Sequence, residues 1–230
     1  MLLCKWEKLP DQMQIPEVRE YYDILKQRTA SLLLKRAFDV VVSLLMLIVL
    51  SPLFLVIAVC IKLDSPGPVF YRQVRITQYG REFRIHKFRS MVDHADRGSK
   101  LTVKGDARVT RVGRFIRKYR LDEISQLLDI LVGDMSFVGT RPEVPKYVAA
   151  YTPEMMATLL LPAGVTSLTS IKYKDEATLL DATDDPDRVY IEEILPGKMY
   201  YNLDGLRNFS CLGDLKLMSM TLLAVLGKEF

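Results

Sequence analysis

The longest apolar stretch of the chain runs from Phe38 to Leu63 and contains few polar residues. A straight helix of roughly 26 residues would be ~39 Å long, which is enough to cross a lipid bilayer. Pro52 removes a backbone donor and clashes with the preceding turn, so a kink is expected there. Each half is then ~18 Å long, too short to cross alone. The pattern therefore predicts a membrane helix with a break at Ser51-Pro52.

Basic residues flank this segment on both sides, and they bear on its topology. Lys35 and Arg36 precede it, and Lys62 and Arg72 follow. Such flanks give a spanning helix no clear orientation, whereas a helix that turns back at the break keeps both flanks on the cytoplasmic side. Ser51 offers a hydroxyl to a carbonyl freed by the proline. On physical grounds a re-entrant helix and a kinked spanning helix are about equally favoured.

The remaining pattern predicts a small soluble domain of mixed structure. Two runs rich in β-branched and aromatic residues, Val69 to Ile76 and Glu82 to Phe88, predict a short β-hairpin. Loops are expected at 92–105 and 136–142. Helices are predicted at Pro16 to Lys35, from about Val112, at Glu123 to Val132, at Tyr147 to Leu161 and at Leu212 to Leu226. By periodicity, the first of these is either an amphipathic surface helix or an ordinary packed helix. The expected fold class is α+β and mostly helical.

Composition and charge narrow the function classes. With 230 residues, of which 49% are hydrophobic, the chain is long enough for one domain and a membrane element. A net charge of +4 suits an anionic membrane surface or phosphorylated ligands and is too small to indicate nucleic acid. The three cysteines are far apart, which speaks against a disulfide framework or a zinc site. The N-terminus does not resemble a cleaved signal peptide, so the membrane segment is expected to be retained.

The candidate chemistry lies where a cationic run meets two adjacent carboxylates. Arginines spaced by three lead through Arg117 into Asp122-Glu123. On the first turn of a helix, one carboxylate can attack a phosphorus atom while the other holds Mg²⁺, a hard cation that binds few carboxylates plus substrate phosphates. Nearby arginines and the helix N-terminus would stabilise the charge on phosphoryl oxygens. The run therefore indicates chemistry on a phosphorylated substrate.

Several short motifs, met in order, resemble one known family. They are Lys35-Arg36-Ala37-Phe38-Asp39, Ser51-Pro52, Ser65 to Phe70, His86 to Met91, Arg117 through Leu121-Asp122-Glu123, Gly133 to Pro142 and Gly213-Asp214-Leu215-Lys216. Together they resemble the bacterial sugar transferases, monotopic phosphoglycosyl transferases that act on polyprenyl phosphate. The resemblance covers nearly everything from Lys35 to Leu226.

The resemblance implies a specific activity and topology. It implies transfer of a phospho-sugar from a UDP-sugar to undecaprenyl phosphate through a covalent enzyme intermediate, with release of UMP, as the first membrane step of a bacterial glycoconjugate pathway. It shifts the topology strongly toward a re-entrant helix. The implied organisation is an N-terminal amphipathic extension (1–34), a re-entrant membrane helix (35–63) and a cytosolic catalytic domain (64–230) with amphipathic helices on the membrane surface. The implied location is the cytoplasmic face of the bacterial inner membrane; whether the chain forms a homodimer is left open.

The resemblance also assigns roles to single residues. Asp122 matches the catalytic nucleophile, and Glu123 matches the catalytic carboxylate associated with the cofactor Mg²⁺. The cationic positions expected near the substrate phosphates are Lys87, Arg89, Arg117 and Arg141, of which Arg89 is the weakest match. A guanidinium suits bidentate phosphate contacts, which supports the arginines on physical grounds.

Three departures from the family pattern limit what can be carried over. Thr140 stands where the family usually has proline, which is expected to loosen that loop. The run Ala163 to Leu168 replaces a common Pro-Gly-Ile-Thr-Gly-Trp near the expected donor site, so the sugar and the pathway stay open. Ser125 replaces a frequent proline and is expected to be harmless in a helix.

Two rival functions have weaker support in the sequence. A metal-dependent glycosyltransferase would use Asp185-Pro186-Asp187 as its metal motif, but no nucleotide-binding βαβ pattern precedes it. A non-catalytic membrane scaffold would use the arginines to bind anionic lipid and would leave Asp122-Glu123 as an ordinary helix start. UMP is the product of a phosphoglycosyl transferase and UDP that of a glycosyltransferase, while a scaffold makes neither.

Overall fold

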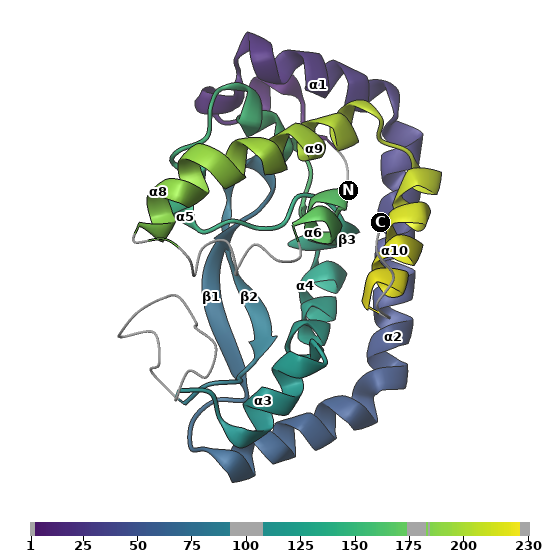
Figure 1. Ribbon diagram of the computed structural model, residues 1–230. Helices are drawn as coiled ribbons and strands as arrows, with labels where there is room; N and C mark the ends of the chain where they lie inside the picture. The colour runs from purple at the N-terminus through teal and green to yellow at the C-terminus, as the bar shows by residue number, and fades with distance from the viewer. Residues whose placement is uncertain (1–2, 93–107, 174–182, 184, 226–230) are drawn as a thin grey trace.

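The apolar stretch forms part of one long helix in the computed structural model, which describes residues 3–92, 108–173, 183 and 185–225 (Figure 1). This helix, α2, spans Thr29–Asp64, a length of 36 residues. Figure 1 shows α2 changing direction partway along, so that its second half runs toward α3 (Arg111–Lys118). Pro52 lies inside it, and the Ser51 hydroxyl donates to the Ile48 carbonyl at 2.8 Å. That carbonyl is the one that lacks a partner because Pro52 has no N–H, so the contact predicted for Ser51 is confirmed.

Most of the apolar surface of α2 faces away from the protein. In the described part of the chain, α2 is the helix that is long and apolar enough to cross a membrane, and only 11% of its most apolar window is buried. An exposed apolar surface of this size marks a membrane or partner contact. After Leu32, the buried positions of the first half are polar instead: Lys35, Asp39 and Ser43, spaced by four, share one face.

Polar contacts fasten this face to the soluble domain. Lys35 Nζ donates to the Val138 carbonyl at 2.8 Å and to Asp214 at 2.6 Å. The Arg36 guanidinium donates to the carbonyls of Ile130 and Leu131, at the end of helix α4 (Leu127–Val132). These carbonyls lie in the last turn, where α-helical donors run out, although the Gly133 N–H also reaches the Ile130 carbonyl at 3.1 Å. The first half of α2 is therefore fixed in register against the domain.

The soluble domain contains two small two-stranded sheets among helices. The predicted hairpin is confirmed as antiparallel strands β1 (Phe70–Ile76) and β2 (Glu82–Phe88). The helix predicted from about Val112 is α3, and the final helix is α10 (Cys211–Val225). The further helices are α5 (Pro145–Val148), α6 (Leu168–Lys172), α8 (Pro186–Val189) and α9 (Leu195–Arg207), with the helical turns η5 (Leu121–Gln126), η6 (Glu154–Leu160) and η7 (Tyr190–Ile194). The fold is mostly helical α+β, as predicted.

The predicted loop at 136–142 was partly wrong. Residues 136–138 belong to β3 (Met135–Val138), which pairs in parallel with β4 (Ala163–Thr166). Two backbone segments approach each other closely at the end of this strand pair. A Cβ on Gly164 would lie 2.1 Å from the backbone nitrogen of Gly139. Only residues without a side chain fit this approach. The Gly164 N–H then donates to the Thr140 carbonyl at 2.8 Å, which holds the start of the following loop.

Two predicted helices are shorter than expected. The helix predicted at Tyr147 to Leu161 is divided between α5 and η6. The N-terminal helix α1 (Pro16–Gln27) ends before α2, and its face with Val18, Tyr21 and Leu25 is buried in a core shared with η6 and α9. Packing inside the protein thus decides between the two alternatives for this helix in favour of the packed form. The loop predicted at 92–105 lies outside the described residues, apart from Val92.

Candidate active site

The two adjacent carboxylates lie on a tight turn at the end of a well-fixed helix. The Thr110 hydroxyl caps α3 by accepting from the Gly113 N–H at 2.9 Å, and Asp64, the last residue of α2, accepts from the Val112 N–H at 2.8 Å. After α3 the chain passes through Arg120, whose φ of 53° is left-handed. Such a backbone is strained for a residue with a side chain, and strain of this kind clusters at functional sites. The Asp122-Glu123 pair follows at once, in η5.

Glu123 is held between two cations from different elements. Its Oε1 accepts from Lys87 Nζ on β2 at 3.0 Å and from the Arg141 guanidinium, in the segment after β3, at 2.6 Å. Its side chain is 18% exposed. Burial by itself would raise the pKa of Glu123, but Arg141 and Lys87 outweigh it and hold the pKa far below its ordinary range. Glu123 is therefore a fixed negative charge, and the fold brings two other predicted site residues, Lys87 and Arg141, against it.

Asp122 has the opposite surroundings. Within the part of the chain that the structure describes, its carboxylate forms no hydrogen bond or ion pair with another residue. Burial raises the pKa of the Asp122 carboxyl, Lys87 works against this, and the Glu123 charge adds to it. Burial also lowers the pKa of the Lys87 ammonium, although Glu123 opposes that shift. Among the described residues, Asp122 is thus a partly buried carboxylate to which no other residue donates.

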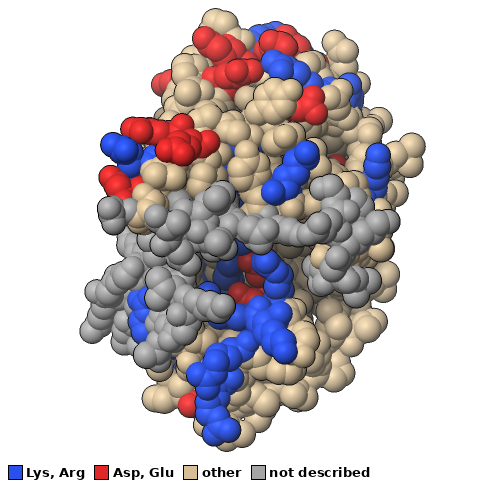
Figure 2. Space-filling model, viewed as in Figure 1, with Lys and Arg blue, Asp and Glu red and all other residues tan. Residues whose placement is uncertain are grey.

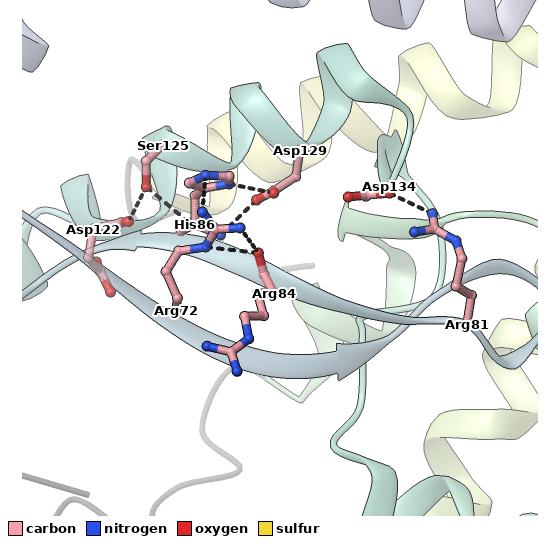
Figure 3. A network of polar contacts seen from close by, with 8 residues as sticks. All are labelled: Arg72, Arg81, Arg84, His86, Asp122, Ser125, Asp129 and Asp134. Atoms are coloured by element: carbon pink, nitrogen blue, oxygen red, sulfur yellow. Dashed lines mark hydrogen bonds and ion pairs between the residues drawn. The ribbon is translucent and has the colours of Figure 1, made fainter. Parts of the chain in front are cut away.

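A second polar cluster fixes the strand that carries Lys87 (Figure 3). Asp129, which is buried, accepts from the backbone N–H of His86 at 2.9 Å and contacts its Nδ1 at 2.7 Å. The Arg72 guanidinium lies 2.6 Å from His86 Nε2, and because arginine only donates, this nitrogen accepts. The proton of a neutral imidazole is then on Nδ1 and points to Asp129. The Ser125 hydroxyl completes the connection, 3.0 Å from the His86 carbonyl and 3.2 Å from the Asp122 carbonyl.

The sequence patterns did not predict this cluster, although His86 lies in one of the motifs of the family resemblance. Asp129 is the one acidic residue of the apolar run Leu127–Val132. A carboxylate in such a run must find a partner when the helix packs, which is a readable signal. Ser125, expected to be harmless, ties η5 to β2 through its hydroxyl.

The other predicted cations lie differently. Arg117 is exposed at the end of α3, and its charge has a small lowering effect on the pKa of Asp122. Arg89 is 4% exposed, and its guanidinium donates to the carbonyls of Ser65 and Pro66 at 2.7 Å. These contacts hold the chain where it leaves α2, so the guanidinium is engaged inside the fold and is not joined to the Glu123 cluster.

The donor set suits a magnesium ion that is shared with a substrate. In the described ranges, no group of three or more histidine, cysteine, aspartate or glutamate side chains gathers as a ready metal cage. Mg²⁺ commonly binds one or two carboxylates and takes its other ligands from water and substrate phosphates. Among the described residues, the Asp122 carboxylate and the second oxygen of Glu123 could supply such ligands.

Charge on the surface agrees with an anionic ligand. Figure 2 shows Lys and Arg side chains bordering a recess on one face, with acidic atoms inside it. The cationic rim would attract a phosphorylated molecule, and the low-dielectric walls would strengthen the attraction. The same view shows acidic residues gathered away from the recess, at the top of the molecule near α1 and at the upper left.

The acidic motif of the rival glycosyltransferase is used for local structure. The Asp185 carboxylate accepts from the Arg188 N–H at 3.1 Å and caps α8. Asp187 accepts from Lys146 at 2.5 Å and from the Tyr147 hydroxyl at 2.9 Å. Both carboxylates are therefore engaged in fixing α8 and its contact with α5.

Comparison with known proteins establishes the family to which the chain belongs. Residues 30–228 match the model of the bacterial sugar transferase family, and the chain belongs to this family. It is 36% identical over 197 residues to the UDP-N-acetylgalactosamine-undecaprenyl-phosphate N-acetylgalactosaminephosphotransferase of Aeromonas hydrophila, covering 84% of this chain and 44% of the relative. It is 34% identical over 194 residues to the UDP-glucose:undecaprenyl-phosphate glucose-1-phosphate transferase of Escherichia coli K12, covering 82% and 39%.

A third relative is similar in length. The exopolysaccharide production protein PSS of Rhizobium leguminosarum bv. phaseoli is 36% identical over 209 residues, which cover 86% of this chain and 99% of the relative. By contrast, the chain spans less than half of the Aeromonas and Escherichia relatives. The matched region contains the whole Asp122, Glu123, Lys87 and Arg141 cluster.

Proposed function

We propose that this protein transfers a sugar 1-phosphate from a UDP-sugar to undecaprenyl phosphate and so begins the synthesis of a bacterial polysaccharide or other glycoconjugate. The observation that carries the proposal is the open Asp122 carboxylate beside a Glu123 that two cations hold ionised. The relatives named for this transfer support the substrate class.

Asp122 is the proposed nucleophile. One carboxylate oxygen attacks the phosphorus atom that bears the sugar, the bond from this phosphorus to the bridging oxygen breaks, and UMP leaves with the bonding electrons. The phosphate of the lipid then attacks the same phosphorus and releases the Asp122 carboxylate. A carboxylate to which no other described residue donates keeps lone pairs for this attack, which is why the lack of such partners matters.

Glu123 and the surrounding cations have a different proposed role. Lys87 and Arg141 meet at Glu123, close to where the donor phosphates would lie, and Arg117 is on the adjoining helix end. Guanidinium and ammonium groups in a partly buried site stabilise charge that develops on phosphoryl oxygens. Glu123, with Asp122 beside it, would hold Mg²⁺, which when bound neutralises the charge of the two donor phosphates.

The proposed membrane arrangement follows from α2. The bend, the Ser51 contact with Ile48 and the exposed apolar face fit a helix that enters and leaves by the cytoplasmic face, where UDP-sugars are found. Cysteines placed near residue 30 and near residue 75 should then both resist an impermeant thiol reagent applied from the periplasm. The positive control is a cysteine in a domain that an engineered fusion exposes to the periplasm, which the reagent should label. Labelling of the residue-30 site alone would show that the helix spans the membrane.

The product separates this function from its rivals. Purified protein in detergent, given a panel of UDP-sugars with undecaprenyl phosphate, should release UMP with at least one donor. The matched control is Asp23→Asn, which removes a carboxylate from an exposed ion pair with Arg19. Release of UDP would support a glycosyltransferase, and release of neither nucleotide with every donor would support the scaffold.

A further inference from the structure

The segment that carries Arg141 has no regular secondary structure, yet three neighbours fix its backbone. The Thr140 carbonyl accepts from Gly164 at 2.8 Å, and the Glu143 carbonyl accepts from the Ile76 N–H at 2.9 Å. Between them, the Pro142 carbonyl accepts from the Arg75 guanidinium at 3.1 Å. These contacts come from β4 and from β1, so the segment is held where the two small sheets approach each other.

The side chain of Glu143 anchors the same segment from a third direction. Its Oε1 accepts from the Tyr190 hydroxyl and from Lys198 Nζ, the latter at 3.2 Å, and Lys198 also donates to the Tyr190 hydroxyl at 2.7 Å. Glu143 is 7% exposed, Tyr190 3% and Lys198 5%. The two partners come from η7 and α9, which crosses one end of the hairpin in Figure 1.

A buried cluster of this kind is not explained by stability alone. Removing two charges from water carries a penalty that their attraction often fails to exceed, so a buried ion pair is weak evidence for a stabilising role. Its directional contacts do fix the position of the groups that make it. Only Pro142 separates Glu143 from Arg141, and proline locks its own φ and restricts the preceding residue to extended backbone. An anchored Glu143 therefore limits where the Arg141 guanidinium can lie.

We propose that Tyr190 and Lys198 are positioning residues that act through Glu143 to hold Arg141 against Glu123. The proposal rests on the proposed function for the role of Arg141 toward the donor phosphates, while the contact between Arg141 and Glu123 is structural. Neither Tyr190 nor Lys198 touches Glu123 in the described contacts. Their influence would reach the site over the rigid link through Pro142.

A conservative variant tests the positioning by its effect on the donor. Tyr190→Phe removes the hydroxyl and keeps the ring. Misplacing a charged group in a reaction site by a fraction of an ångström is expected to lower kcat/KM for the donor by about tenfold. The KM for undecaprenyl phosphate should stay within about twofold, because the proposed function assigns Arg141 to the donor phosphates. The control is Tyr21→Phe, which removes a hydroxyl that donates to Glu154 in a separate core and should leave both constants unchanged.

Two double-mutant cycles decide whether the effect passes through Arg141. In an Arg141→Ala background, Tyr190→Phe should cause no further loss of activity, whereas an undiminished tenfold loss would overturn the proposal. The second cycle measures the apparent Tm in detergent and needs no substrate. Arg141→Ala should lower Tm less in the Tyr190→Phe background than in the wild type, and equal losses would contradict the positioning. Because this cycle is independent of UMP release, failure of the proposed function and failure of the positioning give different results.

Discussion

The two adjacent carboxylates, Glu123 and Asp122, lie in different electrostatic environments. On one side, Glu123 meets Lys87 and Arg141 and has a pKa far below its ordinary range. On the other, Asp122 is partly buried, has a raised pKa and has no hydrogen-bonded partner residue in the described structure. Neighbours in sequence therefore experience opposite environments. Environments that separate the pKa values of two nearby carboxyl groups assign them different roles.

The contrast depends on where the partners come from. Lys87 is held in place because Asp129 and Ser125 fix β2 against η5 and α4, and Arg141 because its segment is anchored by β1, β4 and Glu143. Both cations converge on the side of Glu123. The pair thus obtains its asymmetry from two independent supports, one on each flank of the site.

The largest expected effect is on turnover. Asp122→Asn removes the nucleophilic oxygen and should abolish UMP release, by at least about 10³-fold. Asp23→Asn, on the exposed face of α1, should retain wild-type turnover. Robust turnover in Asp122→Asn would show that Asp122 is not the nucleophile and that the two carboxylates do not differ in function.

Removal of metal should have a similarly large effect that is reversible. If Glu123 and the donor phosphates hold Mg²⁺, EDTA should abolish UMP release and added Mg²⁺ should restore it. The charge of Glu123 should also be needed, so Glu123→Gln should require more Mg²⁺ for half-maximal activity. Full activity in the chelator would show that the second carboxylate has no role in metal binding.

Stability should change in opposite directions when the two carboxylates are neutralised. The folded pKa of Glu123 is lowered, so its charge stabilises the fold above the unfolded value near 4.5, and the effect is lost only as the pH falls below it. Glu123→Gln leaves Lys87 without its carboxylate and should lower the free energy of unfolding by about 3 kcal/mol at neutral pH. Thermal unfolding in detergent, measured from neutral pH to below the unfolded pKa, gives both the loss of stability in Glu123→Gln and the decline of that loss in acid.

Asp122→Asn should raise the free energy of unfolding at neutral pH, by less than Glu123→Gln lowers it. Because the folded pKa of Asp122 is raised, its ionised form destabilises the fold at neutral pH, and this disappears as the pH falls below the unfolded value near 3.8. The variant should therefore unfold at a higher apparent Tm than the wild type at neutral pH and at the same Tm in acid. A lower Tm at neutral pH would mean that Asp122 is a structural carboxylate.

Local patterns in the sequence were sufficient for features that depend on neighbouring residues. The alternation of β1 and β2 predicts the hairpin, and the missing N–H of Pro52 predicts the Ser51 contact. The cluster of Lys87, Glu123 and Arg141 required the family resemblance, because these residues come from three separate elements. Charge spacing alone does not bring them together.

Features that depend on distant contacts could not be predicted in the same way. The parallel pairing of β3 with β4 joins segments about 28 residues apart, and its strands of four residues are too short to show a period. The contacts of Glu143 with Tyr190 and Lys198 span 47 and 55 residues. No periodicity marks such a pair, whereas the isolated acid Asp129 in an apolar run does carry a signal.

A mass measurement on the intact protein distinguishes the role of Asp122 from all others. Wild-type protein is incubated with the active UDP-sugar and no lipid acceptor, and its mass is compared with that of Asp122→Asn treated identically. The wild type should gain the mass of one sugar phosphate on the peptide that contains Asp122, and undecaprenyl phosphate should remove it. Asp122→Asn should gain nothing. An adduct of equal yield on Asp122→Asn, or wild-type turnover that never passes through an adduct, would contradict the proposed nucleophile.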